Sequence, residues 1–261
     1  MTATPPDRRP KPAKILVLQH DSENPPEHLG DWLTAAGADL DVRRLFAGDQ
    51  LPDDTSGHDA VISLGGAMGA DDDAGVSWLT ATKKLLAGTA ESGLPTLGVC
   101  LGSQLLASAT GGRVTKGDRG PEIGAFLIAR RDAAAADPLF AELPLTPDVM
   151  QCHDDTVAEL PPGAVLLASN GYPGGYPHQA FRVGPAAWGV QFHIETSAAR
   201  VRDWAKGKQA TALPIRLGSE LDEAESAMDQ VWRAFAARFV SLAEQHRDHP
   251  GGRRLDLPLA P

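Results

Sequence analysis

Cysteine is scarce in this chain, which has only Cys100 and Cys152 among its 261 residues. A disulfide framework of the kind that holds small secreted proteins together needs more cysteines than this. We therefore expect a reducing compartment and a cytoplasmic protein. The count alone leaves a single disulfide between the two cysteines open.

Long apolar runs and a surplus of basic residues are also missing. The first residues, MTATPPDRRPKPAK, are polar and Pro-rich, and the apolar run at 15–18 is too short for a secretory signal. No stretch approaches the roughly 18–20 apolar residues of a membrane span. The formal net charge is −10, so the basic surface that binds nucleic acid is not expected. We predict neither a membrane partner nor a nucleic-acid partner.

Apolar residues are plentiful, at 42% of the chain, which is enough for a large core. In the first half, short apolar runs alternate with segments of helical spacing. This alternation predicts the α/β class, with a mostly parallel sheet flanked by helices. The expected strands are 15–18, 39–45, 60–64 and 95–99, and the expected helices are 25–36, 78–91 and 100–109.

The second half is richer in strands, which predicts a smaller strand-rich segment there. Expected strands are 122–129, 148–152, 165–169, 179–183 and 187–192, followed by helices at 196–208 and 220–244. The last helix carries an apolar stripe that suits core packing or a homodimer surface. We divide the chain into a disordered leader (1–13), one α/β domain (14–209), a helical extension packed on it (210–247) and a flexible tail (248–261).

A candidate nucleophile lies in the segment Gly98-Val99-Cys100-Leu101-Gly102, between an expected strand and an expected helix. This is the nucleophile-elbow pattern G-x-S-x-G with Cys in place of Ser. The flanking glycines tolerate the tight turn, and the helix N-terminus favours a thiolate. The alternative interpretation is a buried cysteine between packing glycines. Cys152 lacks this context and is expected to be a structural thiol.

A cysteine nucleophile needs a base, and the base needs a group that holds its tautomer. His193 ends an apolar strand and Glu195 follows two residues later, so both can share one face of extended chain. His153 is the main rival and could instead lie on the substrate side. His20 could line the mouth of the sheet.

Backbone donors for a developing oxyanion are expected after the third strand, in Gly65-Gly66-Ala67-Met68-Gly69. The predicted pair is the amide of Gly66 or Ala67 with that of Leu101. A phosphate-binding loop is a weaker interpretation, because neither the G-x-G-x-x-G fingerprint nor a P-loop Lys is present. His and Cys spacing shows no zinc pattern, so we expect no metal and no organic cofactor.

Three segments together resemble the class I (triad) glutamine amidotransferases. They are GGAMGADDD at 65–73, PTLGVCLGSQLLASATGG at 95–112 and WGVQFHIE at 188–195. The resemblance covers roughly 14–202. It is closer to stand-alone members similar to the amidotransferase domain of GMP synthase, on the evidence of segments 121–124, 153–155 and 179–182.

The resemblance implies a flavodoxin-like fold and a Cys–His–Glu triad of Cys100, His193 and Glu195. It also implies hydrolysis of glutamine through a γ-glutamyl thioester, with Gln104 helping to hold the main-chain groups of the substrate. Two positions depart from the family pattern. Ile194 stands where Pro is usual, so we expect a slightly looser triad. Ser103 stands where His is frequent, which affects substrate detail.

We therefore expect an enzyme that hydrolyses the γ-amide of glutamine or a glutamine-like molecule. Because residues 210–261 are too few for a synthetase domain, the ammonia would pass to a separate synthase subunit. The alternative is a free-standing hydrolase of γ-glutamyl amines or peptides. A silent binding domain is less expected, and an α/β-hydrolase is ranked low because its acid precedes its His.

Overall fold

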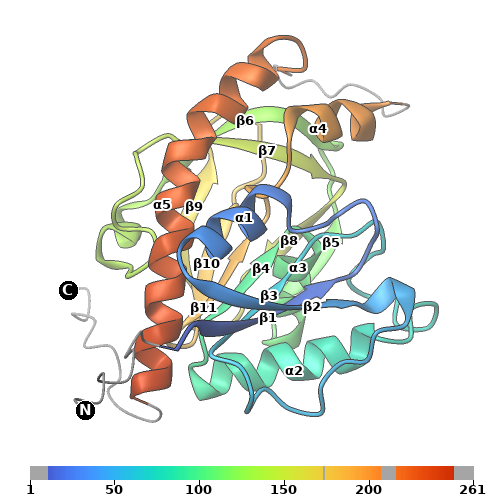
Figure 1. Cartoon of the computed structure of the whole chain (residues 1–261). Coiled ribbons are helices and arrows are strands. Elements are labelled where there is room, and N and C mark those ends of the chain that lie inside the picture. Colours follow the sequence, from blue (N-terminus) through green and yellow to red (C-terminus); the bar gives the residue numbers. More distant parts are fainter. Residues whose placement is uncertain (1–10, 173, 207–215, 250–261) are drawn as a thin grey trace, which may run out of the picture.

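The computed structural model describes residues 11–172, 174–206 and 216–249 (Figure 1). Within this part of the chain, nine strands form one sheet in the order β2-β1-β3-β4-β11-β10-β9-β6-β7. The strands are β1 (Ala13–Gln19), β2 (Ala38–Arg44), β3 (Ala60–Ser63), β4 (Thr96–Val99), β6 (Glu122–Arg130), β7 (Asp148–His153), β9 (Val165–Asn170), β10 (Ala180–Val183) and β11 (Ala187–Val190). Strands β5 (Arg113–Lys116) and β8 (Asp155–Glu159) form a separate antiparallel pair.

The sheet has a parallel half and an antiparallel half. Strands β2, β1, β3, β4 and β11 run parallel, and β10, β9, β6 and β7 continue the sheet in antiparallel pairs. The order of the parallel half is that of flavodoxin-like sheets. The predicted α/β, flavodoxin-like fold class, with a strand-rich second half, is confirmed.

Helices cover both faces of the parallel half, because alternate residues of each strand point to opposite sides. In β1, Ile15 and Val17 join the core that includes residues of α1 (Glu27–Ala35) and α5 (Glu220–Asp248). Leu16 and Leu18 join the core on the other face, under α2 (Leu79–Ser92) and α3 (Leu101–Ala109). The strands therefore read as continuous apolar runs rather than alternating ones.

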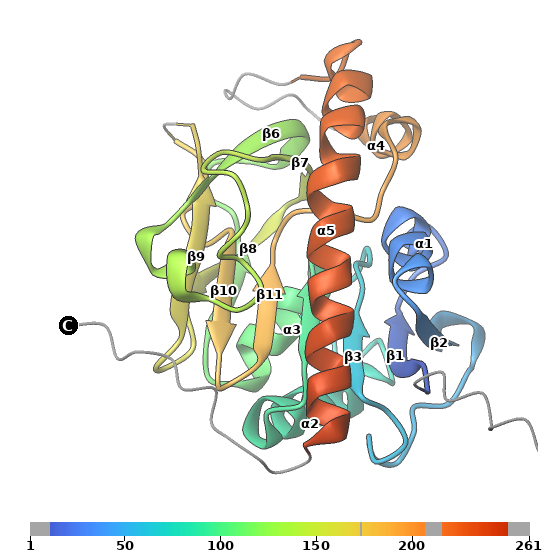
Figure 2. The same cartoon turned by 60° about the vertical axis from the view of Figure 1, so that its left-hand side comes forward.

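The long helix α5 crosses one face of the sheet and packs on α1, β7 and β1 (Figure 2). Its buried stripe includes Trp232, Phe235 and Phe239, and the indole Nε1 of Trp232 donates to the backbone oxygen of Asp148 at 2.9 Å. Burial of aromatic side chains of this size contributes roughly 2–3 kcal/mol each. The expected apolar stripe therefore packs into the main core, one of the two interpretations given for it.

The helix and strand predictions are confirmed to within a few residues, except that strands β5 and β8 were not expected. The sequence RVTK of β5 is half-exposed and carries no apolar alternation. Helix α4 (Ala198–Ala205) is shorter than the expected 196–208, of which residues 207–208 lie outside the described part.

The proposed division into leader, domain, extension and tail stays a prediction. Residues 1–10 of the leader and 250–261 of the tail lie outside the described residues, whereas Ala13 already belongs to β1 and Asp248 to α5. Among the described residues, no helix is both long enough and apolar enough to cross a membrane.

Candidate active site

Four neighbouring parallel strands end at the same edge of the sheet and deliver the candidate residues there. His20 follows β1, the Gly65-Gly66 segment follows β3, Cys100 follows β4, and His193 lies just beyond β11. This edge is where α/β folds bind their ligands. The topology therefore brings together segments that are almost a hundred residues apart in the sequence.

Cys100 occupies a tight strand-to-helix turn. Its backbone has φ +51°, a region that a residue with a side chain rarely adopts and that costs about 1–3 kcal/mol. The turn is held by the Cys100 N–H, which donates to Val190 O at 2.8 Å, and by Ser103 Oγ, which donates to Cys100 O at 2.8 Å. Ser103, where the family frequently has His, thus supports the turn.

The glycines around Cys100 are required by close backbone approach. A Cβ at Gly102 would lie 1.9 Å from Ser63 O, and one at Gly98 would lie 2.4 Å from Gly102 O. Neither neighbour is a side chain that could swing away. The expected tight turn between β4 and α3 is confirmed.

His193 and Glu195 form a buried pair. Their Nδ1 and Oε1 atoms are 2.6 Å apart, and both residues are 1% exposed. Burial lowers the pKa of His193, but the charges of Glu195 and Cys100 and the hydrogen bonds with both residues raise it well above 6.5. A carboxylate at Nδ1 fixes the proton on that nitrogen, so Nε2 is left for chemistry.

Ile194, which stands where the family usually has Pro, forms a hydrogen bond with the buried pair. The N–H of Ile194 donates to Glu195 Oε2 at 3.0 Å, while Oε1 accepts from His193. A proline at this position would have no N–H to donate. The substitution of Ile for the usual Pro therefore supplies a hydrogen bond to the carboxylate, and the expectation of a looser triad does not follow from this geometry.

A cavity of about 480 Å³ opens beside Cys100 and His193. Its lining consists of Asp21, Glu23, Asn24, Gly66, Ala67, Met68, Gly69, Cys100, Gln104, Cys152, His153, Asp154, Asp155, His193 and Trp204. Four of these carry carboxylates and none is Lys or Arg. Burial, followed by the charge of Asp154, raises the pKa of Asp155.

The Gly-rich loop packs closely against the pair. A Cβ at Gly65 would lie 2.6 Å from Asn24 Oδ1 and 3.1 Å from His193 Cε1, so a larger residue here would displace the side chain of Asn24 and press on the ring of His193. Gly66 and Ala67 line the cavity, and Leu101 begins α3 directly after Cys100. The N–H of Ala67 donates to Asp21 Oδ2 at 3.2 Å, so of the two loop amides predicted as oxyanion donors this one is already engaged.

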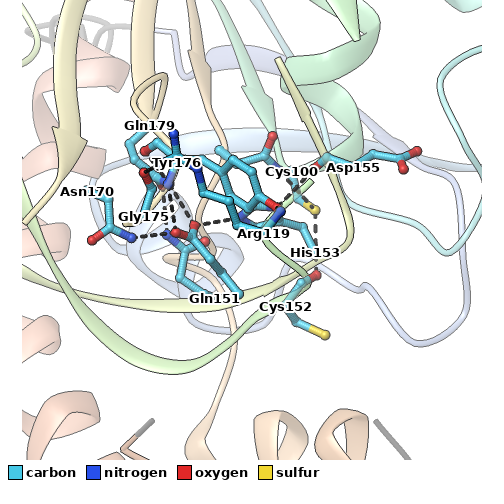
Figure 3. A network of polar contacts seen from close by, with 12 residues as sticks. Cys100, Arg119, Gln151, Cys152, His153, Asp155, Asn170, Gly175, Tyr176 and Gln179 are labelled. Carbon is cyan, nitrogen blue, oxygen red and sulfur yellow. Dashed lines mark hydrogen bonds and ion pairs between the residues drawn. The ribbon is translucent and has the colours of Figure 1, made fainter. Parts of the chain in front are cut away.

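His153 lies in the cavity wall, but both of its ring nitrogens are engaged within the protein (Figure 3). Nε2 lies 2.9 Å from Glu122 Oε2, and Nδ1 lies 2.8 Å from Asp155 O. A carbonyl oxygen only accepts, so Nδ1 carries a proton. His153 therefore has no free nitrogen for the thiol, which favours His193 over its main rival as the base.

His20 is fully buried and does not line the cavity, contrary to the expectation that it could line the mouth of the sheet. Its Nδ1 accepts from Trp78 Nε1 at 3.2 Å, and its Nε2 contacts Ser63 Oγ at 2.9 Å. Burial lowers its pKa to about 4, so the ring is neutral near pH 7. Its Cβ lies beneath Gly66, where it supports the Gly-rich loop.

Gln104 contacts the cavity wall rather than open solvent. Its Nε2 donates to Asp155 O at 3.0 Å and to Gln191 Oε1 at 3.3 Å. Cys100 and Cys152 are not joined in a disulfide, and the sulfur of Cys152 points away from Cys100 in Figure 3. In the part of the chain that the structure describes, no group of three or more His, Cys, Asp or Glu residues is arranged to hold a metal.

Sequence reasoning did not single out four residues that contribute to this site. They are Asn24, Glu122, Gln191 and Trp204. Trp204 packs its ring against His193, with centroids 4.9 Å apart. Gln191 had a usable signal, since it shares the QFHIE segment with His193. Glu122 lies within segment 121–124, which carried part of the resemblance, but nothing in the sequence placed it behind His153. Asn24 and Trp204 lie outside the quoted segments, and only folding brings them near.

The sequence of the chain is similar to those of several known proteins. The family model described as glutamine amidotransferase class-I matches residues 31–202. A GMP synthase (glutamine-hydrolyzing) of Thermomicrobium roseum is 41% identical over 107 residues, which is 41% of this chain and 19% of that protein. Gamma-glutamyl peptidase 5 of Arabidopsis thaliana is 31% identical over 166 residues, 61% of this chain and 62% of that protein.

A solved structure extends the likeness to almost the whole chain. The glutamine amidotransferase from Methylobacillus flagellatus superposes with a TM-score of 0.75 and 25% identity, covering 90% of this chain and 94% of that one. The two sequence matches, in contrast, span less than two thirds of the length of the relatives they come from.

Proposed function

Since the chain belongs to the class-I glutamine amidotransferase family, we propose that it hydrolyses the γ-amide of glutamine or of a glutamine-like molecule through a thioester on Cys100. The observation that carries this proposal is the strained Cys100 beside the buried His193–Glu195 pair, in one cavity. Burial lowers the pKa of His193, but the charge of Glu195, followed by that of Cys100, raises it well above 6.5, which supports His193 as the group that holds the proton taken from the nucleophile.

In the first step the Cys100 thiolate attacks the γ-carbonyl carbon, and the carbonyl oxygen becomes an oxyanion. We assign the oxyanion to the N–H groups of Gly66 and Leu101, since the N–H of Ala67 is bonded to Asp21. Each such donor contributes about 3–4 kcal/mol in comparable sites. His193 then gives its Nε2 proton to the leaving nitrogen, the C–N bond breaks, and ammonia or an amine departs.

In the second step water attacks the thioester while neutral His193 takes one of its protons. The C–S bond breaks, which returns the thiolate and releases the γ-carboxylate. Glu195 holds the ring of His193 throughout and stabilises its charged form. The chemistry uses only groups of this chain and water.

We further propose that the released ammonia passes to a separate synthase subunit. A free-standing hydrolase of γ-glutamyl amines or peptides is the second candidate. The match to gamma-glutamyl peptidase 5 favours it, because that match covers more of this chain than the match to GMP synthase does.

The test is turnover by the purified chain with glutamine and a panel of γ-glutamyl amines and peptides, measuring ammonia, amine and glutamate. Cys100→Ala is expected to lose at least about a thousandfold in rate, as removal of a nucleophile does elsewhere. The matched control Cys152→Ala removes the second thiol and retains turnover. Full activity of Cys100→Ala would refute the proposal. High turnover without a partner favours the free-standing hydrolase.

A further inference from the structure

A continuous series of hydrogen bonds runs from a buried carboxylate to the sulfur of Cys100. The members, in order, are Glu122, His153, the carbonyl of Asp155, Gln104, Gln191 and Cys100. The successive distances are 2.9, 2.8, 3.0, 3.3 and 3.8 Å, the last from Gln191 Nε2 to Sγ. We call these residues the Glu122–Gln191 relay. Figure 3 labels His153, Asp155 and Cys100 of this series.

The relay begins at a carboxylate that is ionised although it is completely buried. Glu122 Oε1 accepts from Asn170 Nδ2 at 2.6 Å and from Tyr176 N at 3.0 Å. Glu122 Oε2 accepts from Gln179 Nε2 at 2.8 Å and faces His153 Nε2. Burial raises the pKa of Glu122, but the hydrogen bond and charge of His153, with the other donors, bring it below its usual 4.5. With four donors around it, the carboxylate has no room for a proton of its own.

The orientation of His153 follows from its two partners. Its Nδ1 lies 2.8 Å from Asp155 O, which only accepts, so this nitrogen donates. Its Nε2 lies 2.9 Å from the carboxylate of Glu122. Because both nitrogens have partners in a buried place, the ring cannot turn without leaving a polar group unsatisfied. The ring fixes the carbonyl of Asp155 in the cavity wall.

That carbonyl determines which way two amides point. Gln104 must turn its NH₂ group toward Asp155 O, since the oxygen of an amide would be repelled there. The second hydrogen of the same NH₂ group then meets Gln191, which must present its oxygen. The NH₂ group of Gln191 is consequently turned to the other side, where Cys100 Sγ lies.

We propose that Gln191 donates a hydrogen bond that stabilises the thiolate of Cys100, and that Glu122, His153 and Gln104 are positioning residues that aim this donor. The part of Gln191 in turnover rests on the function proposed above, whereas its effect on the thiol does not. The donor opposes a second contact of the sulfur, since Sγ lies 4.0 Å from Cys152 O, an acceptor that favours the neutral thiol.

Other titratable groups line the same cavity or stand behind its lining, and they must stay unchanged in a test. They are His193 with Glu195 behind it, His153, Asp154 and Asp155 in the wall between β7 and β8, and Asp21 and Glu23 after β1. Removing the donor of Gln191 leaves all of these groups in place.

The experiment measures the rate at which iodoacetamide alkylates Cys100 between pH 4 and 10. All proteins carry Cys152→Ser, so that Cys100 is the single thiol of the chain. Gln191→Met keeps a long unbranched side chain and removes the donor. A hydrogen bond to a charged group corresponds to about a tenfold change in equilibrium. Alkylation of Gln191→Met is therefore expected to be about tenfold slower at pH values below the pKa of the thiol.

Gln151→Met is the matched control. Gln151 is equally buried and donates to Gln179 Oε1 at 2.7 Å, but it is not a member of the relay. Its alkylation profile is expected to equal that of the parent. Equal profiles for Gln191→Met and the parent overturn the proposal, and so does the same slowing in both glutamine variants.

If Gln191→Met does not fold, Gln104→Met provides the test. Gln104 does not contact the sulfur, but without its NH₂ group nothing holds the oxygen of Gln191, so the Gln191 amide can rotate away from Cys100 Sγ. Slower alkylation than in the parent supports the relay, and a parental profile overturns its orienting part. Turnover of the substrate panel is measured in parallel. If alkylation is slower but no protein turns over any substrate, the proposed function is refuted and the role of Gln191 is supported. If the proteins turn over substrate but alkylation is unchanged, the proposed function is supported and the role of Gln191 is refuted.

Discussion

Replacing Ile194 by the proline that its family usually carries should weaken this protein. The change removes the N–H that donates to Glu195 Oε2 at 3.0 Å. It also exchanges a fully buried, branched side chain of the main core for a smaller ring. The opposing gain is entropic, because proline restricts the unfolded chain.

The losses exceed the gain. A hydrogen bond to a charged group contributes about 1.5–3 kcal/mol, and here the carboxylate would be left with an empty acceptor in a buried place. The smaller ring adds about 1 kcal/mol for lost packing. Proline returns about 0.4–1 kcal/mol through the unfolded state. The net expectation is a loss of about 2–3 kcal/mol in the free energy of unfolding.

Ile194→Val is the matched control, since it keeps the N–H and the branched shape and removes one buried methylene. Its expected cost is about 0.5–1.5 kcal/mol, with kcat/KM close to the parent. For Ile194→Pro we expect kcat/KM to fall about tenfold, because Glu195 is held less firmly against His193. Urea unfolding and steady-state kinetics measure both. A proline variant as stable as the valine variant, with parental kcat/KM, would refute this reasoning.

Two further predictions concern the packing beneath the site. Gly102→Ala would place a Cβ 1.9 Å from Ser63 O and should lower the free energy of unfolding by at least about 2 kcal/mol. In the control Gly88→Ala in α2, nothing lies within 4 Å of the new Cβ, and the free energy of unfolding should rise by about 0.5–1 kcal/mol. Thermal unfolding compares the two variants, and equal effects would contradict the geometry. The second follows from the pKa of His20, lowered from 6.5 to about 4. As the pH drops, His20 is protonated in the unfolded state before it is protonated in the folded state. The free energy of unfolding therefore falls between pH 6.5 and pH 4, by up to about 3 kcal/mol. In His20→Gln the loss between pH 7 and 4 should shrink by that amount in urea unfolding, and an unchanged loss would exclude His20 as its source.

Much of the fold could be predicted because local pattern and final environment agree. Apart from the edge strand β2, the strands of the parallel half are buried on both faces and their sequences are apolar runs, and their helices follow a 3.6-residue period. The expected C-terminus of α1 also holds, since Gly37 has φ +96°. The pair β5–β8 was missed for the opposite reason. Strand β5 is polar and part-exposed, and β8 buries only Thr156 and Val157, which are adjacent, so neither strand has a periodic apolar signal.

The strand–turn–helix around Cys100 could be predicted from the chain alone, because the two glycines and the switch of period are local features. His193 and Glu195 could likewise be placed on one face of a short extended segment. The groups around them depend on the folded arrangement: Ile194 donates to Glu195, the N–H of Ala67 donates to Asp21, and Glu122 lies behind His153. These contacts could not be predicted because a hydrogen bond depends on direction and distance in space. When segments from distant parts of a chain meet at one edge of a sheet, the order of their residues does not show which way each side chain will point.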